Sequence, residues 1–254
     1  MSPRRIVVFA ALLFCLLAAP ARSIAAPYGV EESGGAGDYV VLVHGLDWFR
    51  DTLKPTADFL NRQGFHTINV RYPSRKIACT SEAVEWVGKV VARRCTDPRR
   101  RIHFVAHSMG TVVVREYLAK GRPGQLGHVV LLAAPNRGTP LASSLRWKPL
   151  GRIICPAASG LGCGKKGAPL TEPVAVDFAP GILMGNRAGW FPYFSPFLPG
   201  PDDGVVPVSS GQLPGMAEMR VLPTSHTGMP RNAGTLSETL SFIRTGRFSP
   251  EPLR

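Results

Sequence analysis

The sequence of 254 residues lacks the features that mark several classes of protein. Only 19% of its residues are charged and 44% are hydrophobic, which excludes a disordered, highly charged chain. Glycine and proline are frequent, with 27 and 24 residues, but they follow no collagen-like period, which excludes a fibrous protein. The sequence contains no internal repeat and no second hydrophobic unit, so we expect a single folded domain.

Acidic residues are scarce: 17 Asp and Glu stand against 30 Lys and Arg, a formal net charge of +13. Such an excess of positive charge has three interpretations: the protein binds nucleic acid, it binds an anionic membrane or wall surface, or the charge favours solubility and has no specific partner. The sequence has no zinc-finger, RNA-recognition or basic-helix motif, so we expect no nucleic-acid partner. The basic run Arg99–Arg101 leaves peripheral contact with an anionic membrane or wall surface as a hypothesis. Nothing in the sequence indicates the oligomeric state.

No hydrophobic run is long enough for a typical transmembrane helix, which needs ~20 residues. The longest run, Ile6–Ala19, follows Arg4 and Arg5 and precedes the small residues Ala25 and Ala26. A positive start, a short apolar centre and small residues at the end are typical of a secretory signal peptide. We therefore predict a signal peptide over residues 1–26 and export to the periplasm or the medium. An uncleaved membrane anchor is the alternative.

Cysteine is rare, and no CxxC motif is present, so the spacing predicts no zinc site. Cys15 falls within the predicted signal peptide, which leaves Cys79, Cys95, Cys155 and Cys163. An even number of cysteines in an exported protein suggests disulfides. Because the members of each pair are close in sequence, we expect Cys79–Cys95 and Cys155–Cys163. The other two pairings and free buried thiols remain alternatives.

Short apolar runs alternate with segments of helical periodicity along most of the chain. The predicted strands are Tyr39–Val43, Phe65–Val70, Ile102–Ala106, Val129–Ala133, Gly181–Met184 and Met219–Leu222. The predicted helices are Thr52–Arg62, Ser81–Arg94, Gly110–Lys120 and Asn232–Arg244. This alternation indicates an α/β fold with a mostly parallel sheet of about six strands and helices on both faces. The periodicity fades over residues 135–180, which we interpret as an inserted loop or lid region within a domain over residues 27–254.

A serine lies between a predicted strand and a predicted helix. The segment Ala106–Gly110 reads Ala-His-Ser-Met-Gly, one change from the pattern G-x-S-x-G, with Ser108 at its centre. Small residues two before and two after the serine allow the tight strand–turn–helix bend of a nucleophile elbow. Ser108 is therefore the candidate nucleophile.

Later segments of the chain supply candidate partners for this serine. Asp202 and Asp203 follow the next-to-last predicted strand, where an acid is needed to orient a base, and His226 follows the last strand. The order Ser, Asp, His is the one expected of this architecture. In such folds, two backbone amides bind the oxyanion: one from the loop after the first core strand and one from the residue after the nucleophile. We therefore predict the amides of Leu46 and Met109 as the two oxyanion donors.

These motifs resemble the α/β-hydrolase superfamily and, within it, the small bacterial lipases and esterases. Besides the elbow, the resemblance rests on Val40–Leu46, Val70–Ser74 and Leu132–Ala142, and it covers roughly residues 39–248. It implies the α/β-hydrolase fold.

The resemblance also implies roles for single residues. The family's acid carries over to Asp203, which directly precedes a glycine and two hydrophobic residues, with Asp202 as the alternative. The family's base carries over to His226. The positions of His44 and His107 beside the site imply structural or positioning roles.

The predicted activity is that of an exported serine hydrolase, lipase-like or esterase-like, acting on a lipid or other small-molecule carboxylic ester. Ser108, His226 and Asp203 would act as a catalytic triad through an acyl-enzyme, and this chemistry needs no metal or organic cofactor. An acyltransferase or thioesterase would use the same residues, and a non-catalytic binding protein of hydrolase fold is the alternative from another class. The sequence does not indicate the acyl-chain length or the head group.

Overall fold

The structure, a computed structural model, describes residues 28–46, 51–77, 79–140, 175–188 and 198–250. Its strands are β1 (Gly29–Ser33), β2 (Tyr39–Val43), β3 (His66–Arg71), β4 (Ile102–His107), β5 (Leu126–Leu132), β6 (Gly181–Gly185) and β7 (Glu218–Leu222). Its helices are α2 (Lys54–Arg62), α3 (Thr80–Arg94), α4 (Met109–Lys120) and α8 (Ala233–Thr245), with two short 3-10 helices, η2 (Val208–Gly211) and η3 (Met229–Arg231).

In the described part of the chain, the strands form one sheet in the order β1-β3-β2-β4-β5-β6-β7. Every neighbouring pair is parallel except β1 and β3. All strands predicted from the sequence are present, and β1 is an additional strand at the edge of the sheet. The sequence of β1, GVEES, holds one branched apolar residue and two glutamates, so it shows neither an apolar run nor a clean alternation.

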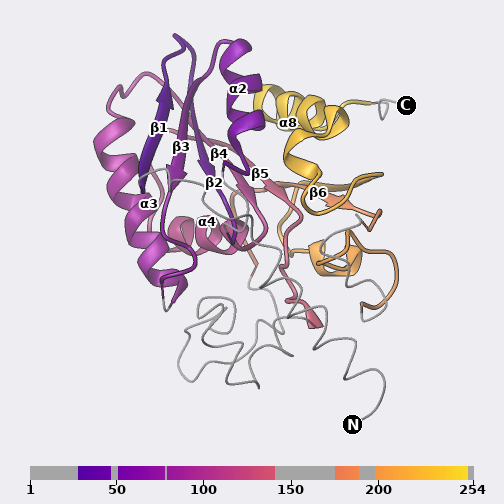
Figure 1. The fold of residues 1–254 in the computed structure, drawn as a ribbon. Coiled ribbons are helices and arrows are strands. Elements are labelled where there is room, and N and C mark those ends of the chain that lie inside the picture. Colours follow the sequence, from indigo (N-terminus) through magenta and orange to yellow (C-terminus); the bar gives the residue numbers. More distant parts are fainter. Residues whose placement is uncertain (1–27, 47–50, 78, 141–174, 189–197, 251–254) are drawn as a thin grey trace, which may run out of the picture.

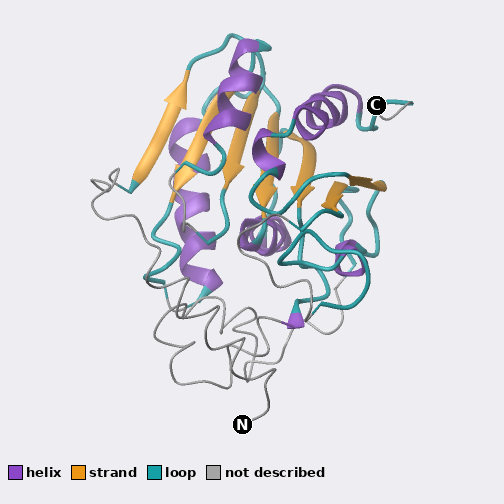
Figure 2. Ribbon diagram, turned by 45° about the vertical axis from the view of Figure 1, so that its right-hand side comes forward, coloured by secondary structure: helices purple, strands orange, loops and turns teal. Residues whose placement is uncertain are grey.

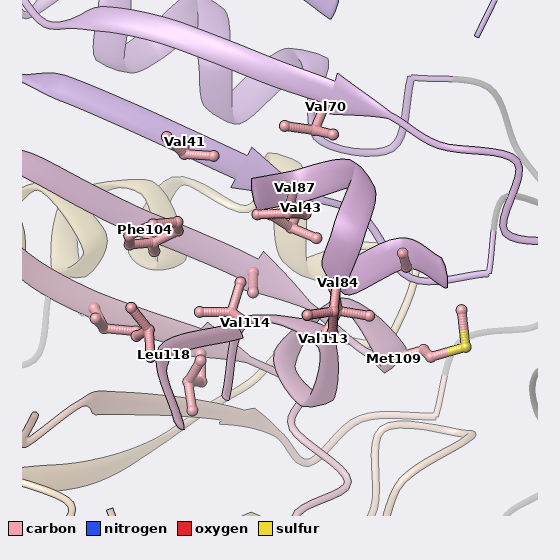
Figure 3. Packing of buried hydrophobic residues seen from close by; sticks show 14 of the residues in the cluster. Val41, Val43, Val70, Val84, Val87, Phe104, Met109, Val113, Val114 and Leu118 are labelled. Carbon is pink, nitrogen blue, oxygen red and sulfur yellow. The ribbon is translucent and has the colours of Figure 1, made fainter. Parts of the chain in front are cut away.

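Helices cover both faces of the sheet (Figures 1 and 2). Successive residues of β2 point to opposite faces, as in any strand. Val41 belongs to a core layer with Val84 of α3 and Val113 of α4, which Figure 3 shows from close by. Val40 belongs to a second layer with Leu60 of α2. Because both faces of the sheet are buried, the central strands consist of continuous apolar runs, and these runs allowed their prediction from the sequence.

Helix bounds differ from the predicted ones by one or two residues, for local reasons. Helix α2 begins at Lys54 rather than Thr52, with Pro55 in its first turn, where a missing N–H breaks no hydrogen bond of the helix. Helix α8 begins after Asn232, which is its N-cap and accepts a hydrogen bond from the Thr235 amide at 3.0 Å.

Strand β2 is the point where the order of strands in the sheet reverses. From β2 the chain passes to β3 on one side and later to β4 on the other. In open α/β sheets, ligands bind beyond the carboxyl ends of the strands at such a point. The turns that follow β2 and β4 are therefore where a site is expected, and these turns carry Leu46 and Ser108.

Two predicted segments lie outside the described residues. They are the signal peptide over residues 1–26 and most of the inserted region, residues 141–174. Both stay predictions. Within the ranges that the structure does describe, no helix combines the length and the apolar character needed to cross a bilayer.

The predicted Cys79–Cys95 disulfide is wrong, because helix α3 lies between the two cysteines. Cys79 is the N-cap of this helix and Cys95 its C-cap. The 15 residues of α3 rise roughly 22 Å, whereas a disulfide needs Cα atoms within about 7 Å. Cys95 is a free, half-buried thiol, and burial raises its pKa to about 12. Cys155 and Cys163 lie outside the described residues, so their pairing stays a prediction.

Candidate active site

Ser108 occupies the turn between β4 and α4, as the N-cap of the helix. Its backbone has φ 56° and ψ −127°, a conformation that residues other than glycine rarely adopt. The Ser108 amide donates to the Leu132 carbonyl at 2.9 Å, and the Ser108 carbonyl accepts from the Thr111 amide at 3.0 Å. Strain of this kind costs about 1–3 kcal/mol and persists only where the surroundings fix the residue. The turn is therefore the tight elbow that the pentapeptide predicted.

Two glycines let this elbow lie directly against the turn that follows β2. A Cβ atom on Gly110 would lie 2.5 Å from the carbonyl oxygen of His44. A Cβ atom on Gly45 would lie 2.7 Å from the Cβ of Ser108 and 3.1 Å from the Met109 amide nitrogen. Helix α4 therefore begins in contact with the β2 turn, and this contact sets where the first amides of the helix point.

His226 connects the serine to a buried carboxylate. Its Nε2 lies 3.0 Å from Ser108 Oγ, and its Nδ1 lies 2.8 Å from Asp203 Oδ2. An ionised carboxylate only accepts hydrogen bonds, so Nδ1 carries the proton and donates to Asp203. Nε2 is left with a lone pair that accepts from the Ser108 hydroxyl. The three residues follow β4, β6 and β7 in the chain and meet at the carboxyl edge of the sheet.

The Asp203 carboxylate is enclosed and uses both of its oxygens. The residue is 1% exposed, and its Oδ1 accepts hydrogen bonds from the amides of Val205 at 3.0 Å and Val206 at 2.7 Å. Burial opposes the charge on this carboxyl, but the facing His226 and the hydrogen bonds outweigh burial, so the pKa of Asp203 lies below its ordinary value. Asp203 is therefore ionised at neutral pH.

The neighbouring Asp202 has a different contact. Its Oδ1 accepts a hydrogen bond from the Gly204 amide at 2.7 Å, and its backbone forms an isolated bridge with Pro207. Asp202 thus helps to close the loop that carries Asp203. Of the two candidate acids in the sequence, Asp203 is the one hydrogen-bonded to His226.

His107, directly before Ser108, contacts the backbone of His226. Its Nε2 lies 3.0 Å from the His226 carbonyl oxygen, and the two rings are 4.8 Å apart. Burial, together with the adjacent His226, lowers the pKa of His107 to about 3, so its ring is neutral at neutral pH. Since a carbonyl only accepts, Nε2 carries the proton and donates it. His107 thus holds His226 in place without adding a positive charge beside it.

The amides of Leu46 and Met109 belong to the two turns that meet at this contact. Met109 is the first residue of α4, so its amide has no partner within the helix. Among the residues that the structure describes, no backbone carbonyl accepts a hydrogen bond from either amide. The N-terminus of a helix also favours a negative charge. The role of these two amides as oxyanion donors stays a prediction.

The segment after β5 braces the loop that carries Asp203, which sequence reasoning missed. Thr139 Oγ1 donates to the Val205 carbonyl at 2.9 Å, and Asn136 Nδ2 donates to the Gly211 carbonyl at 2.7 Å. The Asn136 side chain also accepts from Arg115 of α4 at 3.0 Å. The resemblance of this segment to lipases and esterases was its signal in the sequence, but the likeness did not tell which contacts it makes.

A second group of histidines lies at the amino ends of the central strands. His103 Nε2 lies 3.5 Å from Asp38 Oδ2, and its Nδ1 accepts from the His128 amide at 2.9 Å. Burial lowers the pKa of His103 to about 4, against the opposing effect of Asp38. Both ring nitrogens are therefore occupied within the protein. Across the described ranges, no group of three or more His, Cys, Asp or Glu side chains is arranged to hold a metal ion.

Comparisons with known proteins agree with this architecture. A model of the Alpha/beta hydrolase family matches residues 40–236. The chain is similar to the mature lipase BlEst2 of Bacillus licheniformis, with a TM-score of 0.64 and 17% identity over 88% of this chain and 100% of that one. It is also similar to a structure of the metagenome-derived lipolytic enzymes LipS and LipT (TM-score 0.61, 17% identity, 87% of this chain and 99% of that one). For the carboxylesterase CesB of Bacillus subtilis, the TM-score is 0.54 at 13% identity over 95% of this chain and 98% of that one. No curated protein matches the sequence significantly.

Proposed function

Because the chain belongs to the alpha/beta hydrolase family and has the fold of its lipases and esterases, we propose that it hydrolyses carboxylic esters through an acyl-enzyme on Ser108. The observation that carries the proposal is the line of hydrogen bonds from Ser108 Oγ through His226 to Asp203, at 3.0 Å and 2.8 Å. The lipolytic enzymes and the carboxylesterase among the similar structures support ester hydrolysis as the general class.

In the acylation step, Ser108 Oγ attacks the carbonyl carbon of the ester while His226 Nε2 takes the hydroxyl proton. Ionised Asp203 keeps Nδ1 protonated and stabilises the imidazolium that forms. The tetrahedral oxyanion accepts hydrogen bonds from the amides of Leu46 and Met109. When this intermediate collapses, the bond to the alkoxy group breaks, and the alcohol leaves with the proton from His226.

In the deacylation step, water replaces the alcohol. His226 Nε2 takes a proton from water, the resulting hydroxide attacks the acyl carbon, and Ser108 leaves with that proton as the carboxylic acid is released. The neutral state of His107 supports this cycle, because a cationic neighbour would oppose the formation of the imidazolium at His226. The substrate we propose is an acyl ester of a lipid or of another small molecule.

We further propose that the protein acts outside the cytoplasm, after removal of residues 1–26. Arg4, Arg5 and the apolar run Ile6–Ala19 carry this proposal. Disulfides persist in oxidising compartments, so we propose that Cys79 forms a disulfide with Cys155 or Cys163 after export. N-terminal sequencing of the protein from the culture medium or periplasm tests the export, and a chain that still begins at Met1 would contradict it.

Exposed arginines support peripheral contact with an anionic lipid or wall surface. Arg93, Arg99 and Arg101 are exposed near the amino end of β4. This is the end of the sheet opposite to Ser108, so we propose that such contact holds the protein at a surface while the catalytic edge stays accessible.

The test of the proposed activity is turnover of p-nitrophenyl esters by the wild type and Ser108→Ala. We expect turnover to fall by ~10⁴–10⁶ with an unchanged melting temperature, because the nucleophile is lost and the fold is kept. A serine-directed phosphonate should label the wild type and not the variant. Ser241→Ala is the control, since its hydroxyl on α8 donates to the Arg247 carbonyl at 3.0 Å and takes no part in the site.

Ester turnover that survives in Ser108→Ala would overturn the proposal. The same assay identifies the subclass. A preference for long acyl chains that strengthens once the substrate aggregates favours a lipase, and a preference for short chains favours an esterase. Product analysis with an added alcohol distinguishes hydrolysis from acyl transfer, since a transferase yields the new ester.

A further inference from the structure

We propose that Tyr72, assisted by Arg71, is a positioning residue that fixes the Leu46 amide in the oxyanion site. The inference rests on the proposed function and adds residues to which no role has been given. Arg71 is the last residue of β3, which pairs in parallel with β2, and Tyr72 follows it directly. Tyr72 contacts His44, and Arg71 contacts Asp51.

Tyr72 fixes the residue two positions before Leu46. Tyr72 is 1% exposed, and its hydroxyl donates to the carbonyl oxygen of His44 at 2.7 Å. Its ring stacks on the His44 imidazole, with centroids 4.4 Å apart and planes 13° apart. The imidazole Nδ1 in turn donates to the Gly45 carbonyl at 2.8 Å. Tyr72 therefore fixes both the backbone and the side chain of His44.

Arg71 holds Asp51, which lies five positions after Leu46 in the sequence. Its Nη2 lies 2.6 Å from Asp51 Oδ1 and 2.6 Å from Glu31 Oε2, a residue of the edge strand β1. Asp51 has φ 58°, a left-handed conformation that persists in a residue other than glycine where its surroundings hold it. Glu31 thus orients Arg71, and Arg71 holds Asp51.

We expect the direction of the Leu46 amide to depend on Tyr72, which holds the residue two positions before it. An oxyanion donor must lie about 2.7–3.1 Å from the oxygen that becomes charged in the transition state. A misdirected Leu46 amide would therefore destabilise the charged transition state more than it weakens the binding of the uncharged ester. A positioning role therefore predicts a loss of transition-state stabilisation, whereas a merely structural role predicts a loss of stability alone.

Tyr72→Phe tests the proposal because it keeps the ring and removes the hydroxyl alone. We expect kcat/KM for p-nitrophenyl esters to fall by at least about tenfold, short of the ~10²–10³ that loss of a whole donor costs. An alkyl boronic acid forms a tetrahedral anion on the serine, so its Ki should rise by a similar factor. The pH midpoint of kcat/KM should stay unchanged, because His226 and Asp203 keep their contacts. Asp51→Asn should lower kcat/KM and raise Ki in the same direction by less.

Tyr39→Phe is the matched control. Tyr39 is a buried tyrosine in β2, and its hydroxyl accepts a hydrogen bond from the Asp97 amide at 3.4 Å, at the other end of the sheet. We expect this variant to lower the melting temperature to a similar degree as Tyr72→Phe while kcat/KM and the boronate Ki stay at the wild-type values.

The outcomes separate this inference from the function on which it rests. If the wild type turns over esters and binds the boronate, but Tyr72→Phe does both equally well, the inference is wrong and the proposed function stands. A fall in kcat/KM without a rise in Ki would also overturn the inference. A wild type that neither turns over esters nor binds the boronate would overturn the proposed function and the inference with it. If Tyr72→Phe fails to fold, Asp51→Asn decides with the same two measurements.

Discussion

Replacing Asp203 with asparagine should disable the base by reversing its tautomer. Asp203 uses Oδ1 for the amides of Val205 and Val206, and Oδ2 for Nδ1 of His226. In asparagine only one of the two atoms is an oxygen. The two backbone amides are donors, so they keep the oxygen, and the NH2 group then faces His226. Two donors cannot bond, so the imidazole proton moves to Nε2, where it blocks proton transfer from Ser108.

The size of this effect follows from the contacts that are lost. The same aspartate-to-asparagine change in a serine protease costs ~10⁴ in kcat through the wrong tautomer. We expect a fall of ~10³–10⁴ in kcat here, with KM little changed, because Asp203 is buried behind His226 and does not face solvent. The pKa of Asp203 lies below its ordinary value, so its ionised form stabilises the fold above ~pH 4, and this contribution is lost as pH falls. The variant should therefore be less stable at neutral pH.

The assay is kcat and KM for a p-nitrophenyl ester, with melting temperatures measured in parallel. Asp202→Asn is the matched control, since an asparagine oxygen can still accept from the Gly204 amide, and its kcat should stay near the wild-type value. The reasoning would be refuted by a kcat of Asp203→Asn within about tenfold of wild type. It would equally be refuted if Asp202→Asn lost as much activity as Asp203→Asn.

Two further predictions concern the opposite end of the sheet. The free energy of unfolding should fall as pH drops from ~6.5 to ~4, because His103 has a pKa of about 4 when folded and the unfolded chain takes up the proton first. In urea titrations, His103→Gln should reduce this slope by up to ~1.4 kcal/mol per pH unit, and an identical slope would contradict the reasoning. Binding to vesicles with anionic lipid should weaken as salt rises and when Arg93 and Arg101 are both replaced by glutamine. Binding that ignores salt would argue against an electrostatic contact.

The core strands could be predicted from the sequence because the sheet is covered on both faces. Val40 and Val41 face different helices, so β2 reads as an unbroken apolar run. Edge strand β1 could not be predicted, because Val30 is its one apolar branched residue. The Cys79–Cys95 pairing failed because closeness in sequence was taken for closeness in space, and a helix separates its ends.

The candidate site could be located from the sequence, but its supporting contacts could not. Ser108, Asp203 and His226 stand in motifs at the ends of strands, and the structure brings them within hydrogen-bond distance, while their catalytic roles stay predictions. The choice of Asp203 over Asp202 rested on resemblance, because two adjacent aspartates have nearly the same spacing. Asn136 and the Gly211 carbonyl that it contacts are 75 positions apart, and a local sequence pattern cannot predict a contact over that distance.

The separation of the reacting residues along the chain has a consequence for biosynthesis. His226 and Ser108 are 118 positions apart, and the base follows the last strand of the sheet. Ser108 therefore leaves the ribosome long before His226, and β7 must pair with β6 before the two residues meet. The growing polypeptide therefore cannot carry out the proposed reaction. The proposed activity requires the complete sheet, so turnover recovered after dilution from denaturant would report on the whole fold.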